Sequence, residues 1–148
     1  MISDSIKITG NVKIDIIGAD GAVKDSREIK NLVVTVGKNY IASRMKDATA
    51  TAMTHMELGT GTTAAAVGDT ALQAAISGSR TALTSTTVTT NAIAYVASFP
   101  AGTGTGAVTE AGVFNAASAG TMLCRTVFSV VNKGAADAMS ITWTITVS

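Results

Sequence analysis

The sequence predicts an all-β protein: a sandwich or barrel of antiparallel strands with one or two short helices. Two observations lead to this fold class. Apolar and polar residues alternate in several segments with the period of two that is typical of a half-buried strand. Turn-forming residues separate these segments every ~8–12 residues, the usual spacing in sandwiches and barrels. Together they indicate about eight to ten strands.

The C-terminal segment gives the clearest strand. Between Met139 and Val147, apolar side chains occupy alternate positions, and serines and threonines lie between them. This alternation predicts an antiparallel strand with one face in the core. Trp143 is central in this strand, so we expect its indole to lie in the middle of the core.

The N-terminal residues 5–36 predict a long hairpin. Alternation runs through the first strand to Ile16. Asp20-Gly21 then favours a tight turn, and residues 23–36 return as the second strand.

A short helix is predicted directly after Gly37, over residues 38–47. Its apolar residues are spaced for one face, and its basic residues lie near its C-terminal end, where the helix dipole favours positive charge. These residues are Tyr40, Ile41 and Met45, then Arg44 and Lys46. Because the helix is short, it must pack on the sheet to be stable.

The middle of the chain predicts more strands joined by loops. A strand over 53–58 leads into a loop rich in glycine, threonine and alanine. Asp69 or Thr70 is expected to cap a short helical turn through residues 71–76. Further strands and a flexible loop are expected at 80–90, 91–99 and 101–106, with Pro100 ending the second strand.

Residues 109–128, TEAGVFNAASAGTMLCRTVF, predict two strands around a turn. In the second strand, alternation places Met122 and Cys124 on one face and Arg125 on the other. Glu110 and Arg125 lie on different strands of this hairpin, so the fold decides whether they meet.

Composition limits the classes of partner. Charged residues make up 14% of the chain, the net charge is +1, and no basic stripe exists, so we expect no nucleic-acid partner. No run of about 18 apolar residues exists, so we expect no membrane partner. The first ten residues lack the apolar core of a signal peptide, so we expect the protein to be made and to fold in the cytoplasm.

Few residues are suited to catalysis. His55 is the only histidine, whereas a catalytic triad needs one beside its nucleophile and a catalytic metal site commonly needs two or three. His55 and Glu57 share a strand face and form a candidate pair for a small hydrolase, but a solvated or interface strand face is the favoured interpretation. Cys124 is interpreted as an inert buried thiol, and Glu110 as a structural hydrogen-bonding or ion-pairing group.

The glycine-rich loops do not change this picture. Residues 59–70 lack the P-loop pattern, and residues 102–106 lack the Rossmann spacing. We therefore predict no catalytic, cofactor-binding or metal-ligating residue, no cofactor, and a protein that is not an enzyme.

Several segments resemble small virion proteins of tailed bacteriophages. Their shared pattern is a Gly-Thr-Gly-Thr-Thr loop before Asp-Thr-Ala-Leu, then Thr-Glu-Ala-Gly-Leu-Phe-Asn-Ala and an Arg-Thr-x-Phe strand. The segments concerned are 31–45, 56–76, 94–128 and 141–147. Val113 stands where leucine is more familiar, and Cys124 where alanine is.

This resemblance implies a jelly-roll-like β-sandwich that forms a single domain over residues 1–148. It also implies a capsid decoration (cement) protein on the virion surface, whose partners are the major capsid protein and further copies of itself in a dimer or trimer. Its contacts are expected from Met1–Ser5 and from the loops at 59–68 and 101–106. Similar segments in tail-fibre and baseplate proteins give the alternative, a tail, neck or baseplate component with host-surface binding.

Overall fold

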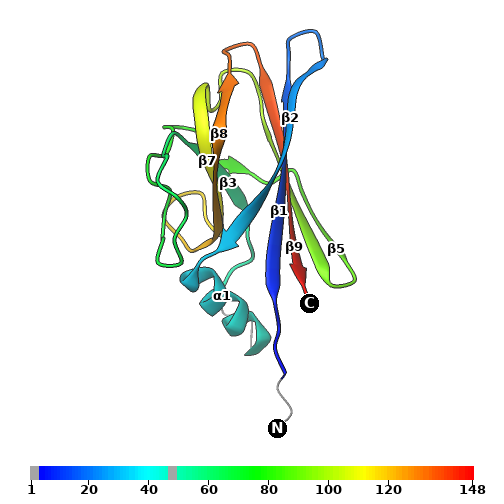
Figure 1. The fold of residues 1–148 in the computed structure, drawn as a ribbon, viewed down its shortest axis with the longest axis vertical. Coiled ribbons are helices and arrows are strands. Elements are labelled where there is room, and N and C mark those ends of the chain that lie inside the picture. Colours follow the sequence, from blue (N-terminus) through cyan, green and yellow to red (C-terminus); the bar gives the residue numbers. More distant parts are fainter. Residues whose placement is uncertain (1–3, 47–49) are drawn as a thin grey trace.

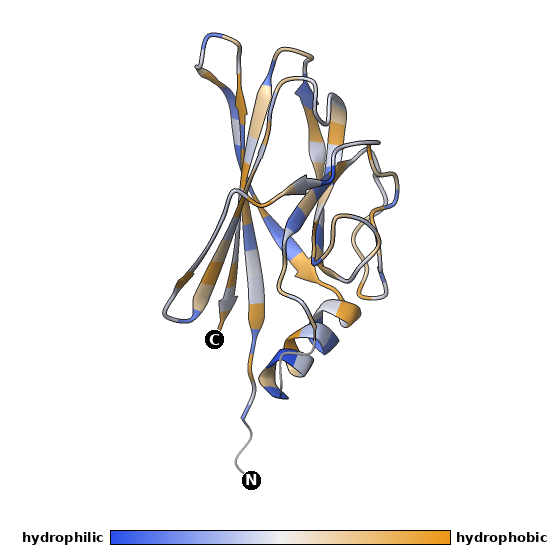
Figure 2. Cartoon of the chain, turned by 180° about the vertical axis from the view of Figure 1, so that it is seen from behind, coloured by the Kyte–Doolittle hydropathy of each residue, from blue (hydrophilic) through white to orange (hydrophobic). Residues whose placement is uncertain are grey.

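Nine strands form one antiparallel sheet in the computed structural model, which describes residues 4–46 and 50–148. The strand order is β4-β3-β7-β8-β2-β1-β9-β6-β5, and the sheet curls into a half-barrel (Figure 1). The strands are β1 (Ile8–Ile17), β2 (Val23–Val33), β3 (His55–Gly59), β4 (Thr81–Ala82), β5 (Ser85–Thr89), β6 (Ala92–Phe99), β7 (Gly106–Phe114), β8 (Met122–Lys133) and β9 (Ala138–Val147). The predicted all-β antiparallel class is confirmed. Bands of apolar and polar residues alternate along these strands, as Figure 2 shows.

The sheet has two halves that meet at β2. One half, called the β7 half, contains β4, β3, β7 and β8; the other, called the β9 half, contains β2, β1, β9, β6 and β5. Only Leu32 and Val33 of β2 pair with β8, whereas β2 pairs with β1 over most of its length. The halves therefore diverge from this short junction and face each other like the layers of a sandwich, although they are parts of one sheet.

The main core fills the space between the two halves. Trp143 is fully buried there, as the C-terminal alternation predicted, and it pairs in register with Val12 on one side and Tyr95 on the other. The inward residues of the β7 half complete the core; they include Met56, Leu58, Ala111, Val113 and Cys124.

The segment predicted as one strand over 80–90 is divided between the two edges of the sheet. β4 pairs with β3 at one edge and β5 pairs with β6 at the other. The two residues between them bridge the halves: Leu83 N donates to Thr54 O, and Thr84 N donates to Val96 O. The chain thus changes halves within two residues, which hydrophobic alternation does not reveal.

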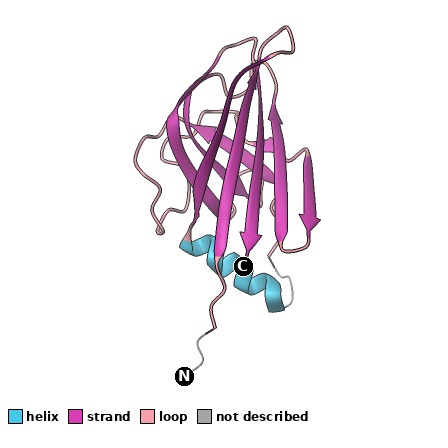
Figure 3. Cartoon of the chain, turned by 45° about the vertical axis from the view of Figure 1, so that its right-hand side comes forward, coloured by secondary structure: helices cyan, strands magenta, loops and turns pink. Residues whose placement is uncertain are grey.

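One helix, α1 (Thr35–Lys46), is present in the described residues, and it lies across one end of the curled sheet (Figure 3). The helix begins at Thr35, before the predicted start at residue 38. Gly37 therefore lies inside the helix, where it is buried against the backbone of β8. Tyr40 and Ile41 pack against the core as expected. Met45, predicted on the same face, is 79% exposed, and position 47 lies outside the described residues.

A β-bulge corrects the predicted faces of β8. Val113 pairs with Cys124, but the next residue of β7, Phe114, pairs with Met122 and skips one position of β8. Met122 therefore leaves the face of Cys124 and joins a small cluster with Phe114 and Val34. Strict alternation was wrong here because a bulge shifts every side chain before it to the opposite face.

Candidate functional site

Glu110 and Arg125 meet on the outer face of the β7 half. Arg125 pairs with Gly112 across the β7–β8 hairpin, and Glu110 is two residues from Gly112 on the same face. Arg125 Nε lies 2.9 Å from Glu110 Oε2, and Arg125 Nη2 lies 2.8 Å from the same oxygen. The carboxylate is 0% exposed and the guanidinium side chain 2%, so both charges are withdrawn from water.

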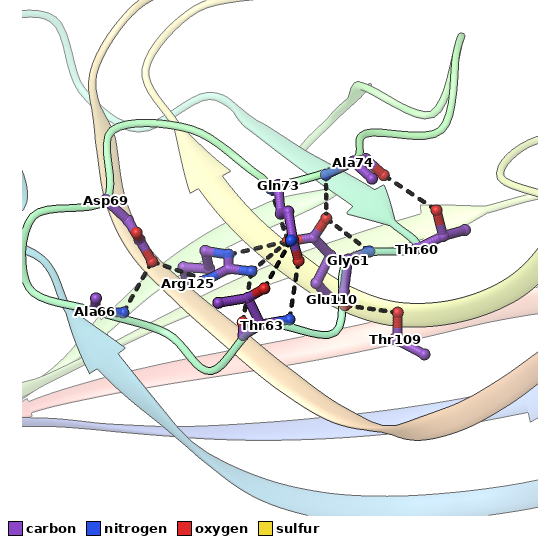
Figure 4. Close-up of polar contacts among 10 residues, drawn as sticks. All are labelled: Thr60, Gly61, Thr63, Ala66, Asp69, Gln73, Ala74, Thr109, Glu110 and Arg125. Atoms are coloured by element: carbon purple, nitrogen blue, oxygen red, sulfur yellow. Dashed lines mark hydrogen bonds and ion pairs between the residues drawn. The ribbon is translucent and has the colours of Figure 1, made fainter.

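The loop over residues 60–76, called the covering loop, buries this ion pair. Glu110 Oε1 accepts hydrogen bonds from Gly61 N at 3.0 Å and Ala74 N at 2.7 Å, and Oε2 accepts one from Gln73 N at 3.0 Å (Figure 4). One carboxylate therefore fixes both ends of the loop. These contacts join residues 36 to 49 positions apart, so they are invisible to local pattern analysis.

Arg125 fixes the middle of the same loop. Its Nη1 donates to Asp69 Oδ2 at 2.8 Å, and its Nη2 donates to the carbonyl oxygen of Thr63 at 3.0 Å. Asp69 Oδ2 also accepts from Ala66 N at 2.9 Å. We call Asp69, Glu110 and Arg125 the clamp. The helical turn predicted over 71–76 was wrong, because this part of the loop is irregular. The N–H groups of Gln73 and Ala74 donate to Glu110 instead of forming a helical turn. Asp69 accepts from Ala66 N and Arg125 instead of capping a helix.

Glycine is required where the covering loop leaves β3. A Cβ atom added at Gly59 or at Gly61 would lie 2.5 Å from Glu110 Oε1. Real Cβ atoms do not approach that closely, so a side chain at either position would displace the carboxylate. The Gly-Thr-Gly pattern thus provides close approach of backbone to a buried charge.

The charge state of the clamp follows from these contacts. Burial alone would raise the pKa of Glu110, but the N–H groups of Ala74, Gln73 and Gly61 and the guanidinium of Arg125 together hold that pKa below its usual value. The hydrogen bond from Ala66 N lowers the pKa of Asp69, and Arg125 lowers it further. Both carboxylates are ionised at neutral pH.

We expect acid to destabilise the protein through this cluster. A carboxylate whose folded pKa lies below its unfolded value contributes stability that is complete above about pH 4.3 and is lost as pH falls through the folded pKa. Melting temperatures measured from pH 7 to pH 3 should therefore fall steeply at the acid end. In Glu110→Gln, which cannot titrate at this site, the acid-dependent fall should be shallower; an identical fall would contradict the assignment.

His55 and Glu57, the candidate pair, each have a different hydrogen-bond partner. Glu57 Oε2 accepts a hydrogen bond from Arg80 Nε at 2.7 Å, and the Arg80 guanidinium lies 3.6 Å from the centre of the Phe114 ring. His55 Nδ1 lies 2.8 Å from Thr54 Oγ1. Arg80 was not singled out from the sequence; its carboxylate partner is 23 residues away, and no local pattern connects them.

Cys124 and Lys133 are two further buried side chains with reactive groups. Cys124 is fully buried, and this burial raises the pKa of its thiol. A buried thiol with a raised pKa is typical of an unreactive cysteine.

Lys133, 1% exposed, donates to the carbonyl oxygens of Pro100 at 3.0 Å and Asp137 at 2.6 Å. Burial lowers its pKa, and the charge of Asp137 partly offsets this. Its role is to hold the turn between β8 and β9.

The described residues lack two features, a metal-binding cluster and a membrane-spanning helix. Residues 4–46 and 50–148 contain no cluster of three or more histidine, cysteine, aspartate or glutamate side chains placed to bind a metal ion. In the same residues, no helix has the length and hydropathy needed to cross a membrane.

Comparison with protein-family models, with curated proteins and with solved structures finds no match to this chain.

Proposed function

We propose that this protein is a structural component of a tailed-bacteriophage virion, and specifically a capsid decoration protein that bridges major capsid subunits. The observation that carries the proposal is where the residues of the resemblance lie. The Gly-Thr-Gly loop (59–61), Asp69, Glu110 and Arg125 are spread over 67 positions of the sequence. They meet in one buried cluster.

This convergence favours a structural role over a catalytic one. Both oxygens of Glu110, one oxygen of Asp69, and Nε, Nη1 and Nη2 of Arg125 are used to hold the chain's own loop on its own sheet. A set of residues with that task preserves an architecture. The resemblance to virion structural proteins and the geometry of the clamp therefore support the same class of function.

The clamp also changes how docking by the 59–68 loop would work. The sequence predicts a contact loop rich in glycine, threonine and alanine, and the clamp orders this loop before any partner binds. A preordered loop loses less conformational entropy on binding. It presents small or apolar exposed side chains, among them Thr62, Ala64, Ala66 and Val67.

The other two predicted contact regions are the loop at 101–106 and the segment Met1–Ser5. Gly104, in the loop at 101–106, lies over Leu58 close to the start of the covering loop. Of the segment Met1–Ser5, residues 1–3 lie outside the described residues, and Asp4 and Ser5 are exposed. Subunits bound only to the intact lattice would stabilise the mature shell by mass action.

The decisive experiment is the copy number of this chain per virion, measured by quantitative mass spectrometry and located by electron microscopy. We expect hundreds of copies, distributed over the capsid surface. About three to eighteen copies confined to the tail would contradict the decoration role and favour the tail, neck or baseplate alternative, since closed rings are small. Absence from purified virions would overturn both.

A matched pair of variants tests the docking loop. Val67, in the covering loop, is 52% exposed, and Val23, at the start of β2, is 58% exposed. Val67→Glu should reduce binding of the purified protein to shells that lack it, whereas Val23→Glu should bind like the wild type. Equal binding by both variants would place the docking surface elsewhere.

A further inference from the structure

β5 forms an open edge of the sheet. It comes last in the strand order and pairs only with β6. All five of its residues are exposed, and Val88 is 69% exposed. Figure 3 shows β5 as the outermost strand of the β9 half. The backbone N–H and C=O groups on its outer side are therefore a template for another strand.

This edge lacks the features that usually prevent such pairing. Proteins protect edge strands with charged side chains, proline, bulges or very short strands. β5 reads Ser-Thr-Thr-Val-Thr, pairs with β6 without a register shift, and lies in a stretch from Thr81 to Thr109 that contains no charged residue.

Two other open edges of this sheet are protected. β4, at the opposite end of the strand order, has only two residues. β2 has an open edge beyond its short junction with β8, and it is densely charged, with Lys24, Asp25, Arg27, Glu28 and Lys30. The contrast indicates that β5 is left unprotected because a strand pairs with it.

An apolar surface continues inward from this edge. Val88 pairs in register with Ile93 of β6, and Ile93 pairs with Ile145 of β9, so the three lie in one row on the same face. Val147 lies on this face as well and is 41% exposed. These residues line a shallow hollow beside β5, which the described part of the chain leaves open.

We propose that β5 pairs antiparallel with β5 of a second copy of this chain, around a two-fold axis at Thr87. In this arrangement Thr87 faces its own counterpart, Thr86 faces Val88, and Ser85 faces Thr89. The sequence is self-complementary because no like charges meet, and the two sheets join into one. β5 carries no charged side chain that would select a partner of complementary charge. This inference does not depend on the virion assignment.

Cross-linking tests the position of the axis. Residues directly opposite in an antiparallel pair have Cα atoms about 4.5–5.5 Å apart, within disulfide range. Thr87→Cys should therefore form a disulfide-linked dimer on mild oxidation, and the native Cys124 is too buried to interfere. Val67→Cys, exposed on the covering loop, is the matched control and should stay mostly monomeric. Equal cross-linking of the two variants would contradict the proposed axis.

Sedimentation velocity tests the association without cross-linking. The wild-type chain should dimerise at micromolar concentration. Thr87→Lys places two ammonium groups opposite each other and should weaken dimerisation at least about tenfold, whereas Val23→Lys should not. Unchanged circular dichroism would show that both variants fold. A wild-type chain that stays monomeric, or an assembly that Thr87→Lys does not weaken, would overturn the proposal.

Discussion

Arg125→Met is expected to lower the free energy of unfolding by about 3–5 kcal/mol, because it leaves the Glu110 carboxylate buried without its cation. Glu110 is 0% exposed, so water cannot replace the guanidinium. The same change also removes the donors to Asp69 and to the carbonyl oxygen of Thr63. Urea unfolding followed by Trp143 fluorescence measures the effect.

The double variant Glu110→Leu/Arg125→Met separates the ion pair from its role as a loop anchor. Removing both charges abolishes the penalty of an unpaired charge, so the double variant should lose less stability than the two single variants added together. It should still be less stable than the wild type. The N–H groups of Gly61, Gln73 and Ala74 lose their acceptor, and a buried donor left unsatisfied costs about 1–3 kcal/mol.

An exposed ion pair supplies the control. Lys13 Nζ lies 3.9 Å from Asp15 Oδ2, and the two side chains are 52% and 25% exposed. Lys13→Met replaces a cation by methionine, as Arg125→Met does. Because this ion pair is exposed, the change should alter the free energy of unfolding by less than about 0.5 kcal/mol. If Arg125→Met were as mild as this control, the clamp would not hold the covering loop.

Strands could be predicted from the sequence where one face is buried and the other is wet. β9 and β6 follow this rule, so their alternation identified them and placed Trp143 correctly. β7 is different: from Val108 to Phe114 every residue is buried, because the main core covers one face and the covering loop covers the other. Alternation reports one buried face, and it cannot reveal a second layer built from a distant segment.

The clamp was invisible for a related reason. The sequence indicated its parts only one by one. The Gly-Thr-Gly segment was predicted as a loop, Asp69 as a helix cap, and Glu110 and Arg125 as residues of one hairpin. What joins them is a set of contacts between residues 15 to 62 positions apart. A loop rich in alanine and threonine looks flexible when judged by its own composition, but its order is imposed by two charged residues of the sheet beneath it.

The junction of α1 with β8 leads to a prediction that opposes helix propensity. Alanine is a better helix former than glycine by about 1 kcal/mol, so Gly37→Ala would stabilise an isolated helix. In this fold a Cβ at position 37 would lie 2.0 Å from the carbonyl oxygen of Leu123. That oxygen belongs to the backbone of β8 and also accepts a hydrogen bond from Val34 N. No rotamer change can relieve the clash, so α1 would have to move.

Gly37→Ala should therefore reduce the free energy of unfolding by about 3 kcal/mol, the upper part of the range for overpacking. Gly68→Ala is the matched control, because a Cβ there would have no neighbour within 4 Å and its φ is not in the left-handed region. We expect this change to be neutral or to stabilise by up to about 1 kcal/mol through the unfolded chain. Urea unfolding of both variants gives the comparison. If both substitutions changed the free energy of unfolding in the same direction, direct packing of α1 on the backbone of β8 would not be what holds the helix across the end of the half-barrel.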